Sequence, residues 1–229
     1  MINIADNIKR IRDAIAEAAL KTGRSPQDIT LVAASKTQPA DAIRQAIAAG
    51  VDAVGENRVR ELLDKKTQGA YIGKPLHYIG NLQSNKVRQL VGACDLIETV
   101  STPALVEMIG QRAVSRGTIQ EVLIEVNIGA EPQKSGILPQ QTEELLAQAA
   151  QTEGISVLGL MAIPPKNGKN EPASRYFDLM FHLFVDMSGK KYDNVPMRFL
   201  SMGMSDSYID AILAGSNMVR IGTAIFGER

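Results

Sequence analysis

Lys36 is the residue of this sequence whose position best suits covalent chemistry. It follows residues 30–35, a run that is almost wholly apolar, as expected of a strand buried on both faces. An amine at the end of such a strand would be partly desolvated, and desolvation favours the neutral form that attacks a carbonyl. A lysine in this position can also extend past the rim of a sheet into water. The sequence leaves a reactive and a solvated Lys36 both open.

Small and hydroxyl-bearing residues lie at the ends of two later apolar runs. Ser201 and Gly203 lie at the end of one, and Gly222 and Thr223 come directly after the other. Hydroxyls and unobstructed backbone amides bind phosphate groups, and phosphate sites in parallel barrels often follow strands 7 and 8. Tight turns would use the same residue types. The location of these residues favours a phosphate site.

Two further polar residues lie at expected strand ends. Arg220 interrupts an apolar run, and its permanent charge needs an acceptor if it lies inside a barrel mouth. An outward-facing salt bridge is the alternative for Arg220. Asn57 either hydrogen-bonds a ligand or caps the helix that follows it. We expect an Arg220→Ala variant to keep its fold, because a barrel core does not depend on a residue at its mouth.

The remaining titratable residues give weaker signals. Glu56 could serve as an acid or base, but a salt bridge at the rim with Arg58 or Arg60 is the stronger expectation. His77 has no partner at metal-ligand spacing, and Cys94 has no second cysteine to form a CxxC motif. We therefore expect no metal site.

Strand-like and helix-like segments alternate along the chain. Short apolar runs predict strands, and longer segments with helical periodicity predict helices between them. The expected strands are 30–35, 52–55, 76–79, 96–100, 121–127, 156–161, 197–201 and 218–221. The expected helices are 41–49, 58–66, 84–90, 103–116, 139–151, 173–187 and 206–214, with Thr102 and Ser205 as two of the caps.

This alternation predicts a single α/β domain over residues 1–229, a (β/α)8 TIM barrel. An additional N-terminal helix precedes it, because Ile4, Ile8, Ile11 and Ile15 share one helical face after a capping Asn3. A doubly wound open sheet is the competing fold. It is disfavoured because no glycine-rich dinucleotide fingerprint follows the first strand.

Composition narrows the range of partners. The 229 residues include 25 Lys and Arg and 25 Asp and Glu, which gives a formal net charge of zero, whereas nucleic-acid-binding domains usually carry a basic surplus. No apolar run approaches the roughly 18 residues of a membrane span, and residues 1–6 lack the pattern of a secretory signal. The lone Cys94 fits the reducing cytosol. We expect a cytoplasmic protein that binds neither nucleic acid nor membranes.

Six blocks of this sequence resemble the pyridoxal-phosphate homeostasis proteins, in the same order and over essentially the whole chain. They are ASKT at 34–37, GENR at 55–58, HYIGNLQSNK at 77–86, GLM at 159–161, LSMGMS at 200–205 and VRIGTAIFG at 219–227. The resemblance implies a barrel like the N-terminal domain of bacterial alanine racemase. It implies pyridoxal 5′-phosphate (PLP) held as an internal aldimine on Lys36, with the phosphate against Ser201, Gly203, Gly222 and Thr223.

The same resemblance implies that Arg220 approaches the pyridine nitrogen and that Asn57 lies beside the ring and its 3-hydroxyl. A permanently charged arginine disfavours a proton on that nitrogen and makes the cofactor a weaker stabiliser of carbanions. Such a cofactor suits carriage or slow proton chemistry.

The function expected from the resemblance is PLP homeostasis without robust catalysis. The racemases close their site with a second β domain, and this chain ends just past the eighth expected strand, so we expect no such domain here. The protein would be a monomer that carries or buffers PLP, influences amino-acid and keto-acid pools, and supplies PLP-requiring apo-enzymes. A PLP-dependent racemase that uses Lys36 as its base, and a phosphosugar-binding barrel without PLP, are the alternatives.

Overall fold

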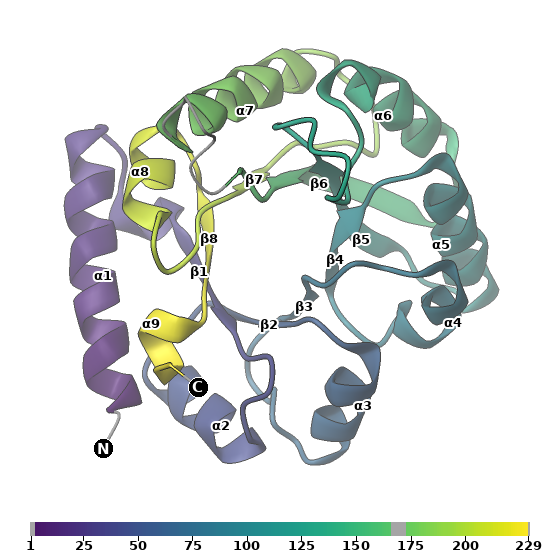
Figure 1. Ribbon diagram of the computed structural model, residues 1–229. Helices are drawn as coiled ribbons and strands as arrows, with labels where there is room; N and C mark the ends of the chain where they lie inside the picture. Colours follow the sequence, from purple (N-terminus) through teal and green to yellow (C-terminus); the bar gives the residue numbers. More distant parts are fainter. Residues whose placement is uncertain (1–2, 166–172, 229) are drawn as a thin grey trace.

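Eight parallel strands close into a barrel in sequence order, each paired with the next and β8 paired with β1 (Figure 1). The computed structural model describes residues 3–165 and 173–228. The strands are β1 (Thr30–Ala34), β2 (Ala53–Glu56), β3 (Leu76–Tyr78), β4 (Leu96–Val100), β5 (Gln120–Val126), β6 (Ile155–Ala162), β7 (Phe199–Ser201) and β8 (Met218–Ile221). The predicted TIM barrel is confirmed.

Helices surround the barrel and cover its outer face (Figure 1). They are α1 (Ile4–Lys21), α2 (Ala40–Ala48), α3 (Val59–Thr67), α4 (Val87–Leu90), α5 (Pro103–Ser115), α6 (Thr142–Gln151), α7 (Ala173–Ser188), α8 (Tyr208–Leu213) and α9 (Thr223–Phe226). Short 3-10 turns at Pro26–Asp28, Ser84–Lys86 and Pro139–Gln141 precede β1, α4 and α6. Within the described residues, no helix is both long and apolar enough to cross a membrane.

The capping predictions have mixed outcomes. Thr102 caps α5 by accepting a hydrogen bond from the Leu105 amide, as expected. The prediction for Ser205 is wrong, because α8 begins only at Tyr208 and Ser207 occupies its N-cap position. The Ser205 hydroxyl instead accepts the Ala224 amide at 3.2 Å, which joins the β7 exit to the β8 exit.

The predicted N-terminal helix packs along the outside of the barrel beside α8, α9 and α2 (Figure 1). Ile8 and Ile15 are each 1% exposed and belong to an apolar cluster that includes Val219. Full burial of such a side chain stabilises the fold by about 1.5–3 kcal/mol. The Asn7 amide also donates to the Ile225 carbonyl at 2.9 Å, so α1 holds the C-terminal strand and α9 together.

The barrel interior changes from apolar to polar along its axis. One apolar cluster in the barrel contains Leu96, Leu123, Phe199 and Met218, among others. Because side chains alternate across a strand, residues two positions later point into the same interior. Those residues are Glu98, Glu125, Ser201 and Arg220, and each of them is at most 4% exposed. The polar layer therefore lies toward the carboxyl ends of the strands, where barrels place their functional sites.

Candidate cofactor site

Lys36, Gly222 and Thr223 line one pocket of about 290 Å³. The pairing of β1 with β8, with Ala33 opposite Ile221, brings the two exits together. A Cβ at Gly222 would lie 3.1 Å from the Ala34 carbonyl oxygen, so a glycine keeps this wall of the pocket open. The pocket thus joins a primary amine to a glycine-threonine turn.

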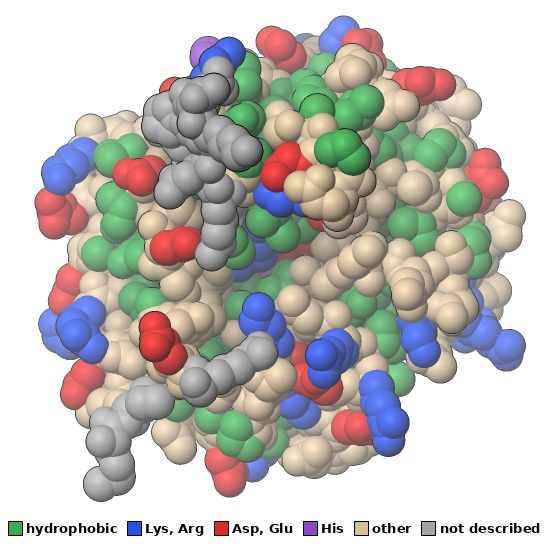
Figure 2. Space-filling view, in the orientation of Figure 1, with side chains coloured by type: hydrophobic (Ala, Val, Ile, Leu, Met, Phe, Trp, Pro, Cys, Tyr) green, Lys and Arg blue, Asp and Glu red, His purple; other side chains and the backbone are tan. Residues whose placement is uncertain are grey.

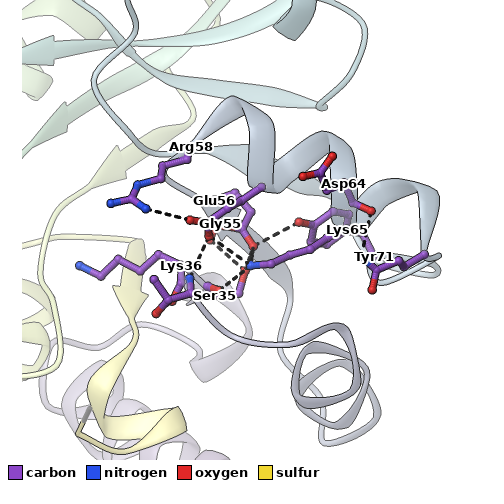
Figure 3. A network of polar contacts seen from close by, with 11 residues as sticks. Ser35, Lys36, Gly55, Glu56, Arg58, Asp64, Lys65 and Tyr71 are labelled. Carbon is purple, nitrogen blue, oxygen red and sulfur yellow. Dashed lines mark hydrogen bonds and ion pairs between the residues drawn. The ribbon is translucent and has the colours of Figure 1, made fainter.

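The Lys36 side chain is exposed, which agrees with the solvated lysine, one of the two alternatives that the sequence leaves open. The reason is that β1 ends at Ala34 and buried Ser35 follows, so the turn carries Lys36 out of the sheet. In Figure 3 the Lys36 side chain extends away from the polar network behind it. Figure 2 shows the surface hollowed near the middle of the barrel, with Lys and Arg side chains beside the hollow.

Gly203 lies at a second pocket of about 300 Å³, which Met204, Ser207 and Ala162 also line. Its φ of +97° requires a glycine, and a Cβ there would lie 2.7 Å from the Ala211 Cβ. Gly203 therefore does not line the same pocket as Lys36. Near both pockets, the contact of Ser205 with the Ala224 amide places a hydroxyl beside α9.

Ser201 and Arg220 lie inside the barrel in a network around Glu98. The Ser201 hydroxyl donates to Glu98 Oε2 at 2.7 Å and accepts from Arg220 Nη1. His77 Nδ1 lies 2.7 Å from Glu98 Oε1, and Arg220 Nη2 donates to the Ala162 carbonyl at 3.0 Å. Neither Ser201 nor Arg220 lines either of the two pockets.

Burial and charge oppose each other in this network. Burial alone would raise the pKa of Glu98, but the hydrogen bond from His77 and the charge of Arg220 bring it below its ordinary value. Burial lowers the pKa of the Arg220 guanidinium, while the charges of Glu98 and Glu125 act in the opposite direction. Burial raises the pKa of Glu125, whose Oε1 accepts the Ser135 hydroxyl at 2.9 Å. Arg220 is thus held between two buried acids, which decides against the outward salt bridge.

Asn57 follows β2 and is half-buried. Its Oδ1 is buried and has no hydrogen-bond partner among the described residues. The capping interpretation is wrong, because Arg58 occupies the N-cap position of α3. A Cβ at Gly80 would lie 2.0 Å from the Asn57 carbonyl oxygen, so the close approach of these two turns fixes the Asn57 backbone. Asn57 therefore offers a free acceptor.

Glu56 does not pair with Arg58 or Arg60, and that prediction is wrong. Its side chain points outward from β2 and is fully buried beneath α3, where Lys65 Nζ donates to Oε1 at 2.7 Å (Figure 3). Arg58 pairs with Glu61 on α3. Two features of the sequence could have indicated this pairing. Glu56 alternates to the outer face of β2, and Lys65 lies on the buried face of α3.

Residues 3–165 and 173–228 contain no group of three His, Cys, Asp or Glu side chains that could hold a metal ion. Cys94 is buried, and burial raises the pKa of its thiol to about 12. Its thiolate, the reactive form, is therefore scarce near neutral pH.

The chain is similar to proteins of one family along its whole described length. The family model for the N-terminal domain of alanine racemase matches residues 3–229. Two relatives are named pyridoxal phosphate homeostasis protein: one from Escherichia coli (strain K12), 41% identical over 100% of this chain and 98% of its own, and one from Aquifex aeolicus, 38% identical over 100% and 99%.

A solved structure extends the similarity to a cofactor-bound relative. PipY of Synechococcus elongatus with PLP bound is 30% identical, has a TM-score of 0.84, and is matched over 98% of this chain and 100% of its own. At these identities and coverages, the chain belongs to the alanine racemase N-terminal domain family and, within it, to the pyridoxal phosphate homeostasis proteins.

Proposed function

We propose that this protein binds PLP and acts in PLP homeostasis, by carrying or buffering the cofactor, with the aldehyde held as a Schiff base on Lys36. The observation that carries the proposal is the pocket shared by Lys36, Gly222 and Thr223. The names of its relatives and the PLP in the PipY structure support it.

The residues present fit the chemical groups of PLP. The pocket offers a primary amine for the aldehyde, and condensation of the two forms a C=N bond and releases one water molecule. Gly222 and Thr223, with the hydroxyl of Ser205 beside α9, provide a close backbone and hydroxyls for the phosphate. The unpartnered Oδ1 of Asn57 provides an acceptor for the ring hydroxyl.

Gly203 and Ser201 have different roles in this proposal. Gly203 allows the β7 exit to approach Ala211 and lines the neighbouring pocket rather than that of Lys36. Ser201 is fully buried and hydrogen-bonded to Glu98, so it supports Arg220 rather than the phosphate.

Arg220 gives the site its non-catalytic character. The guanidinium stays charged and is fixed by Ser201 and the Ala162 carbonyl. We propose that this cation faces the pyridine nitrogen from inside the barrel, where it disfavours a proton on that nitrogen and makes the ring a weak electron sink. PLP held in this way suits carriage and exchange better than carbanion chemistry.

The enzyme alternative is a racemase with Lys36 as its base. Racemisation needs proton transfer on both faces of the α-carbon, and the ionisable side chains that line the Lys36 pocket are Lys36 and the exposed Glu228. We therefore propose that the PLP-loaded protein turns over no single-enantiomer amino acid. Sustained racemisation that Lys36→Ala abolishes would overturn the carrier function.

We further propose that the protein is a cytoplasmic monomer that supplies PLP-requiring apo-enzymes. The buried, unpaired Cys94 supports a reducing compartment. Light scattering of the purified protein tests the monomer. Recovery of activity by an apo-enzyme mixed with the PLP-loaded protein, faster than with an equal concentration of free PLP, tests the transfer.

A titration with PLP tests the central assignment and the phosphosugar alternative together. Wild type should develop the visible absorbance of a Schiff base, and Lys36→Ala should not. Lys9→Ala is the control, because Lys9 is an exposed lysine on α1. Pyridoxal without its phosphate should bind much more weakly. Equal absorbance and affinity in Lys36→Ala would refute the assignment.

A further inference from the structure

The turn that carries Lys36 is strained. Thr37 has a φ of +64°, a left-handed conformation that is costly for a β-branched residue. A residue persists in this conformation only where its surroundings hold it, and such residues cluster at functional sites. The contacts that hold Thr37 therefore also fix the backbone of Lys36.

The turn makes two of those contacts itself: the Gln38 amide donates to the Ser35 carbonyl at 3.0 Å, and the Thr37 hydroxyl donates to the Lys36 carbonyl at 2.6 Å. The others come from α3. Glu61 Oε2 accepts the Thr37 amide at 3.0 Å, and Lys65 Nζ donates to the Ser35 carbonyl at 3.1 Å. Glu61 and Lys65 are four residues apart on one helical face, and Lys65 Nζ lies 3.6 Å from Glu61 Oε2. The hydrogen bond from Thr37 is the largest influence that lowers the pKa of Glu61. The helix thus binds the chain on both sides of Lys36.

Lys65 can bind the Ser35 carbonyl from a buried position because Glu56 neutralises its charge. Lys65 is 8% exposed, and its ammonium lies 2.7 Å from Glu56 Oε1. The same carboxylate oxygen accepts the Ser35 hydroxyl at 2.7 Å and the Tyr71 hydroxyl at 3.1 Å (Figure 3). Ser35 is therefore fixed through its carbonyl and its hydroxyl, which leaves the turn little freedom.

The Lys36 side chain takes no part in this network. It is exposed and points away from Glu56 and Lys65 in Figure 3. Its amine is therefore aimed by the backbone of the turn and not by contacts of its own. A turn fixed from behind lowers the entropy lost when the amine binds a ligand in front of it.

We propose that Glu61 and Lys65 are positioning residues that hold the Ser35–Thr37 turn in the conformation that presents the Lys36 amine to PLP. This inference rests on the proposed function. It adds that α3, a helix outside the barrel, sets the affinity of the site through a strained residue of the turn.

Glu61 is the better residue for a test, because its side chain is 25% exposed. Removing Lys65 would leave Glu56 buried without a counter-charge and would endanger the fold. Glu61→Ala removes the acceptor for the Thr37 amide. Glu17→Ala is the matched control, since it removes an acid from an i,i+4 pair with Lys21 on α1.

Hydrogen exchange of the Thr37 amide reports on the turn without any cofactor. We expect Glu61→Ala to speed this exchange about tenfold or more, because the loss of a hydrogen bond to a charged group frees the amide. Glu17→Ala should leave it unchanged. Unchanged Thr37 exchange in Glu61→Ala would refute the proposal.

Binding of PLP then tests whether the turn positions Lys36. We expect the Kd of Glu61→Ala to rise about tenfold, equivalent to about 1.4 kcal/mol. Adding Thr37→Gly to that variant should recover most of the affinity, because glycine adopts a φ of +64° without strain. A loss that Thr37→Gly does not rescue, or a Kd within about twofold of wild type in Glu61→Ala, would overturn the positioning role.

The two proposals fail in different ways. A wild-type protein that forms no adduct at Lys36 would refute the proposed function. An intact Lys36 adduct with unchanged Thr37 exchange and unchanged affinity in Glu61→Ala would refute the positioning role alone.

Discussion

Replacement of Arg220 by alanine should lower the free energy of unfolding of this protein and also disturb the binding of PLP. The guanidinium is 4% exposed, and it lies 3.6 Å from the fully buried Glu98 and hydrogen-bonds Ser201 and the Ala162 carbonyl. Arg220→Ala would leave the buried Glu98 without the guanidinium, with the His77 ring at 2.7 Å as its remaining ion-pair partner. From the sequence we expected Arg220→Ala to keep its fold; from the buried ion pair we now expect the variant to be less stable.

The magnitude follows from the burial of the pair. Removing one partner of a buried ion pair costs roughly 3–5 kcal/mol. For a chain of this size, each kcal/mol lowers Tm by about 2–4 °C, so Tm should fall by roughly 6–20 °C. Arg60→Ala is the control, because its side chain is 94% exposed and its pair with Asp64 spans 3.8 Å. Its stability should change by no more than about 0.5 kcal/mol.

The stability loss should depend on pH. In wild type the pKa of Glu98 is lowered, so its contribution is present above the ordinary carboxyl pKa and is lost as the pH falls through the folded-state value. Without Arg220, one of the influences that lower this pKa is gone, so the pKa of Glu98 rises relative to wild type, and protonation relieves the buried charge at a higher pH. The difference between wild type and Arg220→Ala should be largest near neutral pH and shrink as the pH falls toward about 4.

Urea denaturation of the apo proteins at several pH values measures the effect. Arg220→Ala/Glu98→Gln should recover at least about 1 kcal/mol relative to the sum of the single variants, because the charge left behind is gone. A loss under about 1 kcal/mol in Arg220→Ala, or no recovery in the double variant, would refute the reasoning.

Three further predictions concern other parts of the molecule. Ile8→Ala should cost about 2–5 kcal/mol in urea denaturation, against about 0.5 kcal/mol or less for Leu20→Ala, whose side chain is 66% exposed. Gly222→Val should weaken PLP binding at least about tenfold, because its side chain crowds Ala34 and closes this wall of the pocket. Alkylation of Cys94 at neutral pH should be slow until urea exposes the thiol, and fast alkylation of the folded protein would contradict its burial.

The sequence predicted the barrel well because each element carries its own periodic signal. Apolar runs marked the strands, and α1 showed its buried face directly through Ile4, Ile8, Ile11 and Ile15. The helix expected at 206–214 begins only at Tyr208, because the first residues after β7 form a turn that Ser205 anchors to α9. That anchor depends on a partner 19 residues away, which no local pattern reveals.

The site was predicted as a set of strand ends but not as a set of contacts. The juxtaposition of Lys36 with Gly222 and Thr223 followed from the closure of β1 on β8. The ion-pair partners of Arg220 and Glu56 could not be predicted in this way. Glu98 becomes a neighbour of Arg220, and Lys65 a neighbour of Glu56, only once the chain is folded. The sequence also left the exposure of Lys36 open, since it depends on β1 ending at Ala34, one residue before the end of the expected strand.

Reduction of the PLP-loaded protein with borohydride, followed by peptide mass analysis, tests the central claim most directly. Borohydride converts a Schiff base into a stable secondary amine and so leaves the cofactor on the lysine that held it. We predict the added mass of reduced PLP on Lys36, at a stoichiometry near one per chain, and its loss in Lys36→Ala. An unmodified Lys36, or an equal yield of modification spread over other lysines, would contradict the account.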